Sequence, residues 1–178
     1  GTAFGETGLQ ELVLPSSLKS LWSMALYGMD QLENITISAN ETYQTKDGAL
    51  YTNGEKTLYF YPSKKTGEYT IPEGVTEIAN DAFNGTNLTK LVIADSVTRM
   101  GEYAFSNSKT LQTIVFGKGI KVISRCCCSG NTALTTVTIP EGVTTVENEA
   151  FVLCPALKEV TLPRSVTSED NAFPANTN

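Results

Sequence analysis

The 178-residue sequence contains no histidine. Histidine is the residue that most often acts as a general base, proton shuttle or metal ligand near neutral pH, so its absence excludes Cys-His and Ser-His nucleophilic catalysis. Basic residues are also scarce, since 13 lysines and arginines stand against 19 acidic residues and the formal net charge is -6. This balance argues against a nucleic-acid partner, because phosphate binding requires clustered positive charge.

Long apolar runs and cofactor motifs are missing as well. No run reaches the roughly 18 residues that a membrane-spanning helix requires, so we predict no membrane span in this chain. The G-K-G segment at residues 117–119 lacks the spacing of a phosphate-binding loop, and Glu73 and Glu141 fall on equivalent turns where we expect them to be solvated. We therefore expect a non-enzymatic protein with no catalytic residues, no metal site and no cofactor. Residues 1–4 lack the charged and apolar segments of a signal peptide, so any such peptide is expected outside this sequence.

The main feature of the sequence is a repeat of 23 residues, marked by a leucine at Leu88, Leu111, Leu134 and Leu157. Strand-like apolar residues follow three and five positions later, so each unit reads L-x-x-L-x-L. A turn such as I-P-E-G-V at residues 71–75 comes next. We expect proline at the second position of this turn and glycine at the fourth. Another apolar residue and an Ala-Phe pair complete the unit.

These repeats predict an α/β leucine-rich-repeat solenoid, a curved right-handed coil. A single unit cannot bury its own apolar face, but stacked units form one continuous core. The L-x-x-L-x-L segments are expected to form a parallel β-sheet on one face. The V-x-x-I and Ala-Phe segments should form short strands or helical turns on the other face. A parallel β-helix is the alternative, and the Ala-Phe pair that recurs from coil to coil argues against it.

The repeats resemble those of the BspA-like leucine-rich-repeat family, which occurs in many bacterial surface proteins and some protist proteins. The resemblance rests on I-P-E-G-V-T followed by A-F, at residues 71–83 and 139–151, and on L-K-E-V-T-L-P at residues 157–163. It covers nearly the whole chain and implies an extracellular or cell-surface protein that mediates adhesion by binding proteins. The asparagine ladder of typical leucine-rich repeats is missing, as in this subfamily. Its position holds serine or glycine, at Ser17, Ser96, Gly119, Gly142 and Ser165.

We predict a single solenoid over residues 1–178 with one insert at residues 41–68. Turn signals within the insert, among them Asp47-Gly48 and Asn53-Gly54, predict an added β-hairpin. Residues 59–62 (Y-F-Y-P) are placed in register with residues 137–140 (V-T-I-P), because both segments end in a proline turn. Ala-Phe pairs at residues 3–4 and 172–173 stand in incomplete units. Both ends are therefore interpreted as truncated repeats, and the chain as a piece of a longer protein or as one whose last coil is degenerate.

Four cysteines occur in the second half of the chain, at Cys126, Cys127, Cys128 and Cys154. By register, Cys127 and Cys128 replace the Ala-Phe pair of the preceding coil. Three interpretations compete: free thiols that pack as small hydrophobic residues, a disulfide between Cys154 and one of the triplet, and a zinc site. Consecutive side chains point in divergent directions, which disfavours tetrahedral zinc, and free thiols are the favoured interpretation. The oxidation state stays open.

Alternation along each strand predicts which side chains point away from the core. The central outward row is expected to hold β-branched residues and one aromatic, at Val13, Thr36, Phe60, Thr70, Val92, Val115, Thr138 and Thr161. Phe60 with Val92 and Val115 is the best candidate patch for a protein ligand, unless the hairpin folds over Phe60. Tyrosines of the insert, Tyr43 and Tyr51 among them, suit glycan stacking. The hypotheses are thus a protein-binding adhesion module, a glycan-binding module, and a structural spacer that displays another domain; ligand identity and oligomeric state stay open.

Overall fold

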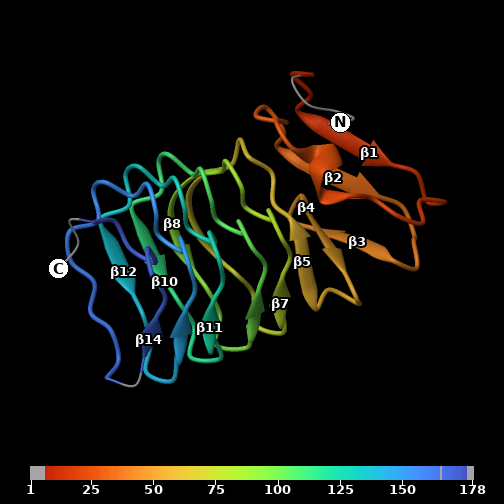
Figure 1. Ribbon diagram of the computed structural model, residues 1–178. Helices are drawn as coiled ribbons and strands as arrows, with labels where there is room; N and C mark the ends of the chain where they lie inside the picture. Colours follow the sequence, from red (N-terminus) through yellow and green to blue (C-terminus); the bar gives the residue numbers. More distant parts are fainter. Residues whose placement is uncertain (1–6, 165, 176–178) are drawn as a thin grey trace.

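The computed structural model describes residues 7–164 and 166–175, and Figure 1 shows their stacked coils. The Ala-Phe pair at residues 3–4 and Ser165 lie outside this part. The strands are β1 (Glu11–Leu14), β2 (Asn34–Ile37), β3 (Tyr43–Lys46), β4 (Ala49–Thr52), β5 (Thr57–Phe60), β6 (Thr66–Thr70), β7 (Glu77–Ile78), β8 (Asn87–Val92), β9 (Arg99–Met100), β10 (Thr113–Val115), β11 (Val122–Ile123), β12 (Thr136–Thr138), β13 (Thr145–Val146) and β14 (Thr167–Ser168). One 3₁₀ helix, η1 (Ser23–Leu26), is the only helical element of the described residues.

Strands of the later repeats form a parallel sheet in the order β12-β10-β8-β6. The sequence predicted one sheet for all repeats, but β1 and β2, which carry Val13 and Thr36, form a separate two-stranded parallel sheet. Val115 of β10 pairs with Val92 of β8 on one side and with Thr138 of β12 on the other. Buried and outward residues alternate along these strands, so that only the central Val137 of β12 is buried. Because equivalent residues of successive coils lie side by side, the leucine repeat becomes one buried ladder.

The opposite face consists largely of two-residue strands, not of helical turns. Strands β5, β7 and β9 pair in parallel there, and β11, β13 and β14 pair in parallel as a separate sheet. The α/β class predicted from the sequence does not describe this structure, which is a β-solenoid. Each coil turns just before its Ala-Phe position at a residue with left-handed backbone, which a right-handed helix does not accommodate. These residues are Asp81 (φ 57°), Tyr103 (φ 56°), Cys126 (φ 53°), Glu149 (φ 60°) and Asn171 (φ 59°).

The proline turns differ from their predicted register by one residue. The Val75 N–H donates to the Pro72 carbonyl, and the Val143 N–H donates to the Pro140 carbonyl, both at 3.3 Å. Proline therefore occupies the first position of the turn and glycine the third, where Gly74 has a φ of 98°. A type II turn requires a positive φ at its third residue, which explains glycine at this position.

The insert contains the predicted hairpin and one strand more. Strands β3 and β4 form the hairpin around Asp47-Gly48, and β5 pairs antiparallel with β4, so that β3, β4 and β5 make a meander. Gly48 has a φ of 78°, and a Cβ at this position would lie 2.5 Å from Oδ1 of Asn34. The hairpin turn therefore requires glycine for both its backbone conformation and its close approach to β2.

The core is divided into two clusters, where the sequence predicted one. The larger core runs from the meander to the last described coil. The smaller core contains Leu12, Leu14, Leu26, Met29, Leu32, Ile35, Tyr43, Leu50 and Phe60. The meander lies between them, since Leu58 of β5 packs in the larger core and Phe60 of the same strand packs in the smaller core. In Figure 1, β1 and β2 accordingly lie on the far side of the meander from the main stack.

Candidate binding surfaces

The outward surface of the β12-β10-β8-β6 sheet has the predicted central row from residue 70 onward. This row contains Thr70, Val92, Val115 and Thr138. Val92 and Val115 are half-buried, and the threonines on either side of them are exposed. In the neighbouring row, Lys90 and Glu68 form an exposed ion pair at 3.0 Å, which contributes little to stability. The centre of this surface is therefore β-branched and uncharged.

Phe60 does not belong to this surface. Strand β5 pairs with β7 on the opposite sheet, so that Leu58 lies beside Ile78, and Phe60 is only 5% exposed in the smaller core. The predicted register with residues 137–140 is wrong. The physical cause of this difference is the antiparallel pairing of β5 with β4, which holds β5 on the opposite sheet although a proline follows the strand. Phe60, Val92 and Val115 thus form no common patch.

The two candidate tyrosines of the insert are buried, since Tyr43 is 5% exposed and Tyr51 is 1% exposed. The Tyr43 hydroxyl accepts a hydrogen bond from the Leu21 N–H at 2.7 Å, and the hydroxyls of Tyr51 and Tyr69 share one at 3.3 Å. Burial raises the pKa of Tyr51, and it raises the pKa of Tyr61 to about 12. These rings fill the two cores, so Tyr43 and Tyr51 offer no ring face for stacking on a sugar.

All four cysteines are buried free thiols, which is the interpretation favoured from the sequence. The predicted register is confirmed, because the Phe105 N–H donates to the Cys127 carbonyl as the Phe83 N–H donates to that of Ala104. The sulfur atoms of Cys127 and Cys128 lie 3.4 Å apart. Burial raises the pKa of the Cys154 thiol to about 11. Cys154 is therefore a poor nucleophile, because the thiolate is the reactive form and burial suppresses it.

A buried polar ladder that the sequence analysis did not anticipate runs along the larger core. Its members follow the Ala-Phe position of successive coils and are at most 2% exposed: Thr86, Ser108, Asn131 and Cys154. Ser108 donates to the Phe83 carbonyl at 3.2 Å, and Asn131 Nδ2 donates to the Phe105 carbonyl at 3.0 Å. Cys154 Sγ donates to the Cys128 carbonyl at 3.2 Å. The ladder satisfies buried carbonyl groups of the preceding coil, and Cys154 is one of its members.

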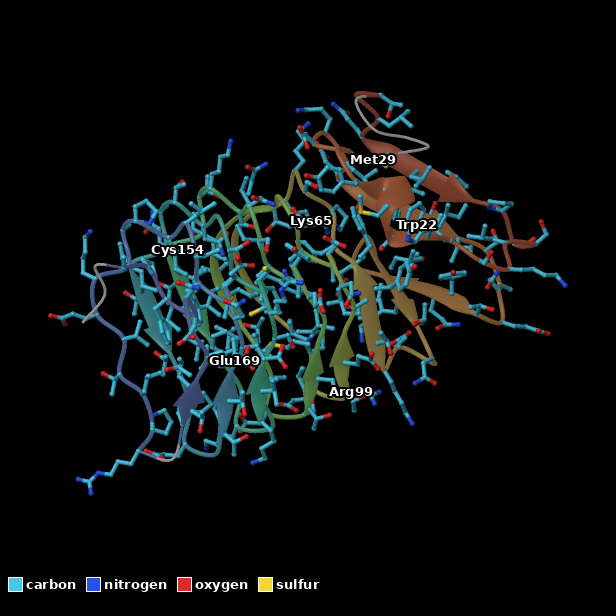
Figure 2. The ribbon with its side chains drawn as sticks, viewed as in Figure 1. Trp22, Met29, Lys65, Arg99, Cys154 and Glu169 are labelled. Atoms are coloured by element: carbon cyan, nitrogen blue, oxygen red, sulfur yellow. The ribbon has the colours of Figure 1, made fainter. Side chains whose placement is uncertain are left out.

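Across the described residues, no group of three or more Cys, Asp or Glu side chains is placed to hold a metal ion. Within the same part of the chain, no helix is long and apolar enough to cross a bilayer. Charged side chains instead make single ion pairs along the face of the short strands, such as Arg99 with Glu77 at 2.6 Å. Figure 2 shows Arg99 and Glu169 on this face. The geometry of the described residues thus presents surfaces and hydrogen-bonding groups.

Comparison with known proteins gives a family match over the whole chain. The model described as the BspA type leucine rich repeat region matches in six copies, over residues 1–55 and 54–178. No curated protein matches the sequence.

Three solved structures share the fold. A leucine rich cell surface protein from Faecalibacterium prausnitzii is 29% identical with a TM-score of 0.82, and the match covers 93% of this chain and 47% of that one. A leucine-rich repeat protein from Eubacterium ventriosum is 26% identical with a TM-score of 0.63, covering 93% of this chain and 58% of that one. The pneumococcal vaccine antigen PcpA is 21% identical with a TM-score of 0.70, covering 96% and 55%. The chain therefore spans about half the length of the structures it matches.

Proposed function

The chain belongs to the BspA-type leucine-rich repeat family, and we propose that it is a non-catalytic module of an extracellular or cell-surface protein that binds a protein partner through its β12-β10-β8-β6 sheet. The surface location is supported by the similar protein of F. prausnitzii, which is described as a cell surface protein. Solenoids present extended surfaces that suit protein partners. Adhesion is the role that we expect such binding to serve.

The observation that carries the proposal is the pair of valines at the centre of the sheet. Val92 and Val115 are adjacent in register and half-buried, with exposed threonines on both sides. Charged residues are depleted at the centre of protein interfaces, and this part of the surface is uncharged. Large aromatic anchors are absent from the row, so we expect a weak interface that gains its affinity from area.

The test places a charge at this centre. The Val115→Glu variant introduces a carboxylate that a protein partner would have to desolvate. Val122→Glu is the matched control, because Val122 is a 37% exposed valine on β11, which belongs to the opposite sheet. Binding of the purified chain to a panel of purified extracellular-matrix and serum proteins is measured by biolayer interferometry, and thermal unfolding shows that both variants are folded.

Saturable micromolar binding that Val115→Glu abolishes and Val122→Glu preserves would support the proposal. Binding that resists Val115→Glu would place the interface elsewhere on the molecule. If none of the proteins binds saturably, the spacer hypothesis replaces the protein-binding proposal, since a spacer needs no ligand of its own.

A further inference from the structure

A cleft with both polar and apolar lining lies where the segment after η1 meets the larger stack of coils. Its inner part has a volume of about 210 Å³ and is lined from four segments, within residues 23–30, 60–63, 81–85 and at Asn107. An outer part of about 300 Å³ shares Asp30, Gly85 and Asn107 with the inner part, so the two are continuous. Figure 2 shows Met29 and Trp22 on the N-terminal coils that form one side of this junction. Ligand sites are common where separately packed units meet.

Carboxylate and amide groups line one wall of the cleft in a fixed arrangement. Asn84 Nδ2 donates to Asp81 Oδ1 at 2.9 Å, and Asn107 Nδ2 donates to Asn84 Oδ1 at 3.2 Å. This relay orients the three side chains, and each amide nitrogen keeps a second N–H for another acceptor. Asp30 lies at the boundary of the inner and outer parts. The wall therefore offers both hydrogen-bond donors and acceptors.

Ser63 adds a hydroxyl group to the lining of the inner cleft, and the residue is only 5% exposed. A hydroxyl group can both donate and accept a hydrogen bond, so Ser63 suits either kind of polar group on a ligand.

The remaining lining is apolar. Tyr27 is 43% exposed at the cleft, and Leu26 and Phe60 lie beneath it in the smaller core. A pyranose has the same division, since its C–H groups form an apolar face and its hydroxyls point outward. The inner lining contains no lysine or arginine and two aspartates, which disfavours a phosphate or sulfate group.

We propose that this cleft binds a neutral saccharide, with a terminal pyranose residue in the inner part. An inner volume of about 210 Å³ is below the roughly 300–1,000 Å³ of sites for drug-sized ligands, so it accommodates one sugar ring. A second sugar residue extends into the outer part, beside Gln31 and Lys109. The cleft is separate from the valines of the sheet, and either proposal can fail without the other.

The experiment is a saturation-transfer NMR screen of the whole chain against methyl glycosides of glucose, galactose, mannose, fucose and N-acetylglucosamine, followed by titration of the strongest binder. We expect a dissociation constant in the millimolar range for a single ring. Asp30→Asn and Tyr27→Ala should each weaken binding about tenfold, as expected for loss of a charged hydrogen bond or of a stacking face. Both residues are exposed, so their variants should keep the unfolding temperature of the parent chain.

The chain offers matched controls. Tyr103→Ala removes a tyrosine that is 37% exposed on another turn, and Asp170→Asn neutralises an exposed aspartate in the last coil. Neither should change the affinity. The proposal is overturned if no glycoside binds, or if the two control variants weaken binding as much as the cleft variants. It is also overturned if lysine methyl ester displaces the glycoside in an Asp30-dependent way, because the cleft would then be a site for cationic side chains.

Discussion

Cys128 is smaller than the residue at the equivalent position of the next coil, whereas Phe116 is larger than its own equivalent there. These opposite differences in size permit a quantitative test of how the core is packed. Cys128 stands where that coil carries Phe151, as its N–H bond to the Ala150 carbonyl shows. Phe116 is equivalent to Ile139 of the next coil, because the Phe116 N–H donates to the carbonyl of Thr138, the residue before Ile139. The rings of Phe116 and Phe151 meet edge-on with centroids 6.5 Å apart. We infer that Phe116 fills the space that a phenylalanine at position 128 would take.

The two single substitutions should each destabilise the fold, and together they should compensate. Cys128 is fully buried, so Cys128→Phe overpacks the core at a cost of about 1–3 kcal/mol. Phe116→Ile leaves a cavity and should cost about 1–3 kcal/mol, less than the 3–5 kcal/mol of a Phe→Ala change. The double variant restores the Ile and Phe arrangement of the neighbouring coil. We expect a favourable coupling free energy of about 1–3 kcal/mol, the upper part of the range for residues in contact.

The assay is urea unfolding of the parent chain, the two single variants and the double variant, with the midpoint and the slope fitted for each. The control cycle combines Cys128→Phe with Ile35→Val, which lies in the smaller core and should be additive. If Phe116→Ile and Cys128→Phe are also additive within error, the two side chains do not share one space. The explanation of the cysteine triplet as a packing substitution would then be wrong.

Three further predictions concern the buried residues. Asn131→Ala should lower the free energy of unfolding by about 1–3 kcal/mol, because the Ser108 N–H and the Phe105 carbonyl lose their partner; an unchanged urea midpoint would contradict the polar ladder. Phe60→Ala should cost about 3–5 kcal/mol and lower the melting temperature, whereas an exposed Phe60 would leave it unchanged. Because burial raises the pKa of Tyr61 to about 12 while an unfolded tyrosine titrates near 10, stability should be intact below pH 10 and fall as the pH rises toward 12. Unfolding free energies measured from pH 8 to 12 check this, and Tyr61→Phe should reduce the loss.

Much of the fold could be predicted because a solenoid is specified locally. Each coil repeats the same apolar spacing, so the register of Val92 with Val115 and of Cys127 with the Ala-Phe position followed from counting residues. The polar ladder had a similar signal, since Thr86, Ser108, Asn131 and Cys154 recur at intervals of 22, 23 and 23 residues. It was missed because its members differ in chemistry and share only the ability to donate to a carbonyl.

The insert could not be predicted in the same way, because its pairing is not periodic. The sequence around Phe60 ends in proline as the sheet strands do, but its partner is decided by the hairpin that precedes it. A β-bulge between β4 and β5, where the pairing register shifts between Leu50 and Tyr51, then places Leu58 and Phe60 in different cores, which no single repeat indicates. The cleft depends on the same long-range arrangement. Tyr27 and Asp81 are far apart in the sequence, and only the folded meander brings their segments to one place.

The meander also explains why the cleft should be preformed. Its two faces are buried in different cores, and hydrogen bonds fix the N-terminal coils against it, from the Ile35 N–H to the Gly48 carbonyl at 2.9 Å and from the Lys64 N–H to the Leu32 carbonyl at 3.1 Å. An ion pair between Lys64 and Glu33 at 2.6 Å adds to the same junction. A site whose walls are already fixed loses little conformational freedom on binding, which matters most for a small ligand with few contacts. The insert that interrupts the repeat is thus what gives an otherwise uniform solenoid a concave and chemically distinct site.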